Sequence, residues 1–177
     1  MLELEEKARI FKPLRDYEKP AALFVHMQDN YVDGLMPEEK QTLLSSQKDV
    51  INYCNKNRIL MVLLQYDAPV TKHLEPIVKE IPDNKKIIWA YKGANGFESP
   101  ELSETLHLLN IRNLLITGIN ASWCVKATAQ GAIDCGFEIL TARELIADNY
   151  MYRKNCKRLD WFLRNSIYYP DYKLLLE

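Results

Sequence analysis

The sequence lacks an excess of charge, a long apolar run and a cysteine-rich pattern, and each absence excludes a class of protein. Its 23 basic residues are balanced by 24 acidic ones, so the net charge of -1 offers no positive field for a nucleic-acid backbone. The longest apolar run, 59–64, is far shorter than the roughly 20 residues that cross a bilayer. We therefore expect no nucleic-acid partner and no membrane span.

The acidic segment 1–7 lacks the positively charged start and apolar stretch of a secretory signal, so a cytoplasmic location is expected. Four cysteines without C-x-x-C spacing argue for reduced thiols rather than a disulfide framework. Three of them are predicted to be small buried hydrophobic side chains: Cys54, Cys135 and Cys156. The fourth, Cys124, lies in a different context.

Apolar runs alternate with segments of helical periodicity, and no Gly/Ser linker or repeat interrupts the 177 residues. This predicts a single domain, 1–177. Strands are expected at 21–26, 59–64, 86–91, 112–117 and 137–140, with a possible edge strand within 167–176. Helices are expected at 37–56, from Ser99-Pro100 onward, at 121–134 and at 153–164.

The segment 59–64 is apolar on both faces, which a strand can bury only if helices cover both sides of the sheet. The alternation therefore predicts an α/β fold, a three-layer sandwich with a mostly parallel central sheet of about six strands. Ligands of such folds bind beyond the carboxyl ends of the strands. The segments to inspect are 26–31, 65–67, 92–97 and 118–124.

Cys124 follows a predicted strand and a turn, at the expected opening of a helix. Unpaired N–H groups and the helix dipole favour an anion there, so we expect a stabilised thiolate that could act as a nucleophile. The same N–H groups could bind the oxyanion of a tetrahedral intermediate. Packing of a small side chain in an apolar helix is the alternative interpretation.

Two further residues lie at the same predicted edge of the sheet. Lys92 could supply a cation that lowers the thiol pKa, or could simply be a solvated lysine. His26 ends the first strand, and an imidazole suits proton transfer near neutral pH, although a hydrogen-bonded core histidine is the alternative.

Three ordered segments carry a family resemblance: 22–31 (A-L-F-V-H-M-Q-D-N-Y), Lys92 with Phe97 downstream, and 118–125 (G-I-N-A-S-W-C-V) followed by Thr128-Ala129. They resemble the isochorismatase-like cysteine hydrolases, a family that includes nicotinamidases and carbamoyl-amide hydrolases. The resemblance implies that Cys124 is the nucleophile, that a cis peptide joins Ile119 to Asn120, and that the chain forms a homo-oligomer.

One position departs from the family pattern, because His26 stands where the family has its catalytic aspartate. Two interpretations follow: an altered site of Cys124, His26 and Lys92, in which the imidazole takes the thiol proton, or a site that has lost its chemistry. Asp29 is a weaker candidate for a substitute carboxylate.

The family's nicotinamidases bind a metal through a segment like D-x-H-x-x-x-H. Asp67 and His73 are present here, but Pro69 replaces the middle histidine, so we expect no metal and no other cofactor. Trp89 and a set of predicted substrate-binding residues could line a pocket, with core packing as the alternative for the aromatic ones. That set is Tyr31, Tyr66, Phe97, Asn120 and Trp123.

The leading hypothesis is a hydrolase that acts on a small amide or related carbonyl substrate through Cys124. A catalytically inactive binding or assembly module is the alternative, and a redox-sensing thiol is a third. The aromatic residues between 161 and 172 could contribute to an oligomer interface or to the core.

Overall fold

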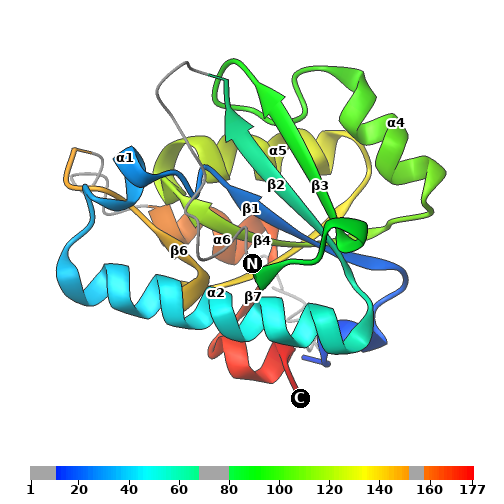
Figure 1. Cartoon of the computed structure of the whole chain (residues 1–177), viewed down its shortest axis with the longest axis horizontal. Helices are drawn as coiled ribbons and strands as arrows, with labels where there is room; N and C mark the ends of the chain where they lie inside the picture. The colour runs from blue at the N-terminus through cyan, green and yellow to red at the C-terminus, as the bar shows by residue number, and fades with distance from the viewer. Residues whose placement is uncertain (1–10, 68–79, 152–157) are drawn as a thin grey trace, which may run out of the picture.

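The computed structural model describes residues 11–67, 80–151 and 158–177. A parallel sheet with strand order β3-β2-β1-β4-β5-β7 forms its centre, and the short β6 pairs with β4 (Figure 1). The strands are β1 Pro20–Val25, β2 Leu60–Tyr66, β3 Lys86–Tyr91, β4 Asn113–Ile119, β5 Glu138–Ala142, β6 Ile146–Ala147 and β7 Ile167–Tyr169.

The helices are α1 Asp29–Val32, α2 Pro37–Asn57, α4 Pro100–Leu108, α5 Lys126–Asp134 and α6 Arg158–Asn165. A π-helical turn, η3 Ala121–Val125, leads directly into α5, and short 3-10 turns occur at η1 Leu14–Asp16, η2 Asp83–Lys85, η4 Arg143–Leu145 and η5 Tyr172–Leu175. Both α2 and α4 begin with proline, whose missing N–H has no partner to lose in the first turn of a helix.

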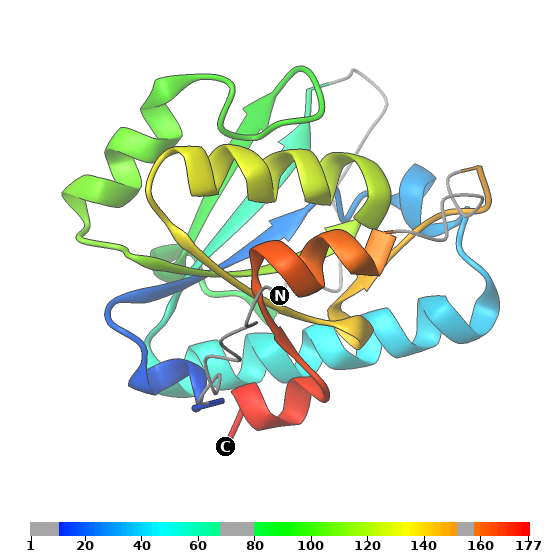
Figure 2. The ribbon, with the colours of Figure 1, turned by 180° about the vertical axis from the view of Figure 1, so that it is seen from behind.

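Successive strand residues alternate between two hydrophobic cores, one on each face of the sheet. Phe24 and Leu63 belong to the core under α2, whereas Leu23 and Val62 belong to the core under α4, α5 and α6. Figures 1 and 2 show α2 on one side of the sheet and α5 and α6 on the other. Because both faces are buried, the strands read as continuous apolar runs. The predicted three-layer sandwich is confirmed.

Two strands differ from the prediction. β6 is only two residues long, too short for a period of hydrophobicity to show. The predicted edge strand stops at Tyr169 because Pro170 follows, and proline lacks the N–H that continues a ladder. Most of the aromatic residues between 161 and 172 belong to the core, since Phe162, Tyr169 and Tyr172 are buried.

The prediction that three cysteines are small buried side chains is confirmed for one of them. Cys54 is a buried free thiol, Cys135 is half-buried, and Cys156 lies outside the described residues. Within 11–67, 80–151 and 158–177, none of the helices is long and apolar enough to cross a membrane.

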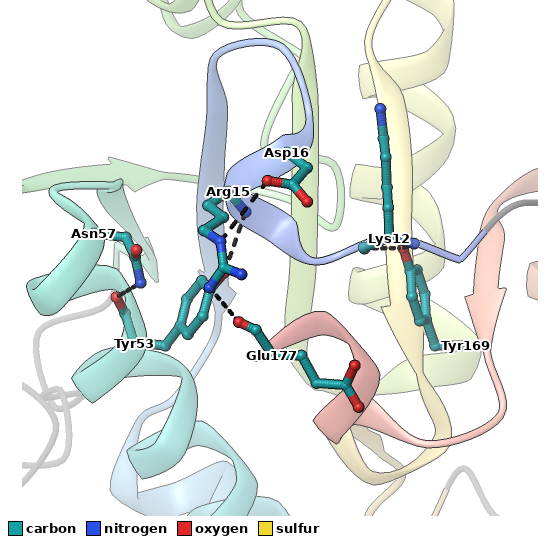
Figure 3. A network of polar contacts seen from close by, with 7 residues as sticks. All are labelled: Lys12, Arg15, Asp16, Tyr53, Asn57, Tyr169 and Glu177. Carbon is teal, nitrogen blue, oxygen red and sulfur yellow. Dashed lines mark hydrogen bonds and ion pairs between the residues drawn. The ribbon is translucent and has the colours of Figure 1, made fainter.

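A polar network connects residues 12–16 with the C-terminal segment and with α2 (Figure 3). The Tyr169 hydroxyl donates to the Lys12 carbonyl at 2.7 Å, and the Arg15 guanidinium donates to the Glu177 carbonyl. Since β7 forms an end of the sheet, these contacts fasten the first described residues to its edge strand.

Candidate active site

The turn that carries Cys124 begins where β4 reaches the carboxyl edge of the sheet. Gly118 there has a φ of +134°, and a Cβ at this position would lie 2.1 Å from the Val25 carbonyl oxygen. Only glycine lets β1 and β4 approach so closely. The predicted cis peptide between Ile119 and Asn120 is present, so this prediction is confirmed. The π-helical turn follows at once.

Cys124 is a free thiol that is 7% exposed. Burial raises its pKa to about 11, although the N–H groups of Asn120 and Cys124 lower it. The expectation of a stabilised thiolate is therefore wrong for the protein without substrate. The N–H groups act in the predicted direction, but the loss of water around the sulfur outweighs them.

His26 follows β1 in a left-handed conformation with a φ of +51°, and it is 1% exposed. Its N–H donates to the Leu64 carbonyl at 2.9 Å, which continues the ladder to β2. The imidazole stacks between Tyr31 and Tyr91, with centroid distances of 5.4 and 5.3 Å, and meets Tyr66 edge-on at 6.0 Å. Three tyrosine rings thus enclose the imidazole.

Tyr91 connects this cluster to the turn that carries Cys124. Its pKa is raised chiefly by burial, and the charges of Cys124 and Tyr31 raise it further, while the Thr128 hydroxyl lowers it. Thr128 lies one helical turn after Cys124 and accepts a hydrogen bond from the Gly96 N–H at 3.1 Å. The Tyr91 side chain is therefore stacked on the imidazole and interacts electrostatically with the thiol.

Lys92 differs from His26 and Cys124 in its exposure to water. It is exposed, and together with Tyr91 it lines a cavity of about 580 Å³ whose wall also contains Trp89 and the acidic residues Asp67, Glu98 and Glu101. Because Tyr91 borders this cavity as well, the cavity lies next to the His26 cluster.

Residues 20–160 match the family model of the isochorismatase domain. The chain belongs to the isochorismatase domain family. No match to a curated protein was found.

Solved structures of this family share the fold of the chain. N-carbamoylsarcosine amidase from Thermoplasma acidophilum is 18% identical, with a TM-score of 0.70 over 82% of this chain and 91% of that chain. A nicotinamidase from Staphylococcus aureus is 16% identical, with a TM-score of 0.73 over 86% and 98%. The YcaC gene product of Escherichia coli, an octameric hydrolase of unknown specificity, is 16% identical, with a TM-score of 0.71 over 90% and 77%.

The other predicted substrate-binding residues are spread over different environments. Phe97 is 6% exposed and packs against Phe137 with a centroid distance of 5.6 Å, so it belongs to the core. The Asn120 side chain is buried and accepts a hydrogen bond from the Asn149 N–H. Trp123 is 55% exposed, and Asp29 is also exposed. Tyr31 and Tyr66 are thus the two that meet the imidazole.

Three or more His, Cys, Asp or Glu side chains do not gather to hold a metal ion anywhere in the described part of this isochorismatase domain. Asp67 is exposed at the end of β2, and Pro69 and His73, the other positions compared with the family's metal-binding segment, lie outside the described residues.

Three residues that organise the site were not predicted from the sequence. The Gln28 side chain exchanges two hydrogen bonds with the Tyr66 backbone, at 2.9 and 3.2 Å, which holds the end of β2 beside His26. Asp148 and Asn149 form hydrogen bonds with Ser122 and Asn120, in the turn that carries Cys124. They directly follow the apolar residues 145–147, and polar residues after an apolar run were the available signal.

Proposed function

We propose that this isochorismatase domain hydrolyses a small amide, with Cys124 as the nucleophile and His26 as the base. The observations that carry the proposal are that the His26 imidazole stacks on Tyr91, that the Tyr91 side chain interacts electrostatically with Cys124, and that the Asn120 and Cys124 N–H groups bond the sulfur. The solved amidase and nicotinamidase with the same fold support an amide as the substrate class.

The chemistry follows from the state of the thiol. Because its pKa is about 11, the sulfur is protonated at neutral pH, so the proton must leave as the sulfur attacks. His26 takes that proton while the sulfur bonds to the carbonyl carbon, and the N–H groups of Asn120 and Cys124 bind the oxyanion. The imidazolium then protonates the leaving amine, and water hydrolyses the thioester to release the acid and restore the thiol.

Substrate enters in this proposal through the cavity that Lys92 and Tyr91 line. Lys92 is a cation at its exposed wall and provides an electrostatic contact to the substrate, while Tyr31 and Tyr66 hold the imidazole. No metal takes part in these steps. Treatment with a chelator is therefore expected to leave turnover unchanged, and loss of turnover that zinc restores would contradict this part of the proposal.

A catalytically inactive member of the family is the second candidate, and one observation favours it. His26 is almost fully buried among three tyrosine rings at the family's aspartate position, so its nitrogens are shielded from water. Redox sensing is disfavoured, because the thiolate is the form that oxidises and the thiol pKa is raised.

Ammonia release from a panel of small primary amides and N-carbamoyl compounds separates the two candidates. The hydrolase proposal predicts turnover by the wild type, its loss in Cys124→Ala, and a lower rate in His26→Asp. An inert wild type whose His26→Asp variant turns over supports the inactive candidate. Absence of ammonia with every variant contradicts hydrolysis of this substrate class.

We also propose that the chain forms a homo-oligomer, supported by the octameric state of the YcaC gene product. Light scattering coupled to size-exclusion chromatography gives the mass directly. A mass that stays at 20.7 kDa over a wide range of protein concentration would contradict this proposal.

A further inference from the structure

β6 is short, but its position beside β4 is specific. β4 pairs with β5 along its first half, and with β6 at its carboxyl end, where Gly118 faces Ile146 and Ile119 faces Ala147. The segments that follow β4 and β6 therefore leave the sheet side by side. The next residues of each are the nucleophile turn on one side and Asp148-Asn149 on the other.

Side-chain contacts continue where the ladder ends. One carboxylate oxygen of Asp148, Oδ1, accepts hydrogen bonds from the Ser122 N–H and the Ser122 hydroxyl, both at 2.9 Å. The Asn149 N–H donates to Oδ1 of Asn120 at 2.9 Å. Asp148 is 0% exposed, whereas its partner Ser122 is half-buried.

These contacts hold the two residues on either side of Ala121. Asn120 is also bonded from within the turn, because its carbonyl accepts from the N–H groups of Trp123 and Val125 at 3.0 Å each. The turn is thus fixed from inside by its own backbone and from outside by residues 148 and 149. Its N–H groups at Asn120 and Cys124 are the ones that act on the sulfur.

A buried carboxylate is costly unless hydrogen bonds compensate for its lost hydration, so a position that only needed packing would be better filled by an apolar residue. Asp148 instead accepts a hydrogen bond from the Ser122 N–H, in the first turn of the segment that carries Cys124, where a negative charge is favourable.

We propose that Asp148 is a positioning residue, which acts through Ser122 to hold the Cys124 turn in its reactive geometry. This inference rests on the proposed hydrolysis for its activity readout. Its structural content, the orientation of the donors around the sulfur, can be measured on the thiol alone.

The experiment compares Asp148→Ala, Asp148→Asn and Ser122→Ala with the wild type. Both Asp148 variants lose the charge, but asparagine keeps an oxygen that can accept from Ser122. Ser122→Ala removes only the hydroxyl bond and keeps the charge. Tyr172→Phe is the control, because it also deletes one hydrogen bond, from the Tyr172 hydroxyl to Asp49, far along the chain from the turn. Circular dichroism establishes that each variant is folded.

The first readout is the rate of Cys124 alkylation by iodoacetamide against pH, followed by mass spectrometry of the labelled peptide. We expect the midpoint of Asp148→Ala at higher pH than that of Asp148→Asn, because only alanine leaves the Ser122 N–H and hydroxyl without an acceptor and so loosens the turn. Equal midpoints in these two variants would show that the carboxylate acts through its charge alone, and would overturn the proposal. If Asp148→Ala does not fold, a midpoint of Ser122→Ala equal to that of the wild type overturns it.

The second readout is amide turnover. Misplacement of the nucleophile predicts that kcat of Asp148→Ala falls about tenfold or more with KM little changed, that Asp148→Asn retains more activity, and that Tyr172→Phe matches the wild type. A wild type without turnover but with separated alkylation midpoints contradicts the hydrolysis and supports the positioning role. An active wild type whose Asp148→Ala variant has the same kcat contradicts the positioning role alone.

Discussion

The His26 imidazole lies against the Tyr91 ring with a centroid distance of 5.3 Å and an angle of 24° between the planes. This stack joins the end of β1 to the end of β3, two strands that are separated in the sheet by β2. Tyr91 also interacts electrostatically with Cys124, so its side chain links the proposed base to the proposed nucleophile.

Replacing Tyr91 by phenylalanine or by alanine separates the ring from its hydroxyl. Tyr91→Phe keeps the stack and is expected to cost about 1 kcal/mol of stability or less, whereas Tyr91→Ala leaves a cavity and is expected to cost about 3 kcal/mol. Loss of the ring also opens His26 to solvent. We expect modification of His26 by diethyl pyrocarbonate to be faster in Tyr91→Ala than in Tyr91→Phe, and equal rates would show that the ring does not shield the imidazole.

Gly118 is predicted to be intolerant of any side chain. Gly118→Ala would bring a Cβ to 2.1 Å from the Val25 carbonyl oxygen, and since the obstacle is backbone, β1 and β4 must move apart. The expected loss is about 3 kcal/mol or more, measured by urea denaturation.

Gly136→Ala is the matched control for Gly118→Ala. Gly136 also has a positive φ, +88°, but a Cβ there meets nothing within 4 Å, so only the backbone strain remains, about 1 kcal/mol. Equal losses in the two variants would mean that strain, and not the close approach of the strands, decides the result at Gly118.

The sequence was sufficient to predict the long parallel strands of the sheet, but not the direction in which the pKa of Cys124 is shifted. The strands around Leu23 and Leu63 were predictable because burial on both faces leaves an unbroken apolar run. The sign of the pKa shift of Cys124 was not, because it depends on how much water reaches the sulfur. The role of Asp148 was hidden for a related reason: its hydrogen-bond partner Ser122 is 26 residues away, and no periodicity connects them.

Cys54 makes the stability of the protein dependent on alkaline pH. Burial raises the pKa of its thiol from 9.0 to about 12. The folded protein therefore holds this proton more tightly than the unfolded chain, so the stabilisation is complete below about pH 9 and is lost as the pH rises towards 12.

Cys54→Ala removes this titration. Unfolding by urea, followed between about pH 8 and pH 10.5, is expected to show a smaller fall in stability for the variant than for the wild type, although the variant is less stable at pH 8 through lost packing. The tyrosines and Cys124 titrate in both proteins, so the difference reports Cys54. Parallel curves would mean that the Cys54 thiol ionises alike in both states.

The Tyr169 hydroxyl forms the hydrogen bonds that connect the edge strand β7 to Lys12 (Figure 3). The hydroxyl donates its proton to the Lys12 carbonyl at 2.7 Å, so at the 2.6 Å contact with the Tyr17 hydroxyl it must accept. It also accepts from the Lys12 N–H at 3.2 Å. Burial and the neighbouring Tyr169 both raise the pKa of Tyr17, as expected for a hydroxyl held in this contact.

Tyr169→Phe would leave the Lys12 N–H, the Lys12 carbonyl and the Tyr17 hydroxyl each without this partner, while the ring still fills its place in the core. Since an unsatisfied buried polar group costs about 1–3 kcal/mol, we expect a loss of about 3 kcal/mol. Tyr17→Phe removes one of the three bonds and is expected to cost about 1 kcal/mol. Tyr172→Phe again serves as the control, because its hydroxyl bonds only a part-buried carboxylate on α2. A loss in Tyr169→Phe no greater than in Tyr172→Phe would show that the ends of the chain are held by packing and not by this hydroxyl.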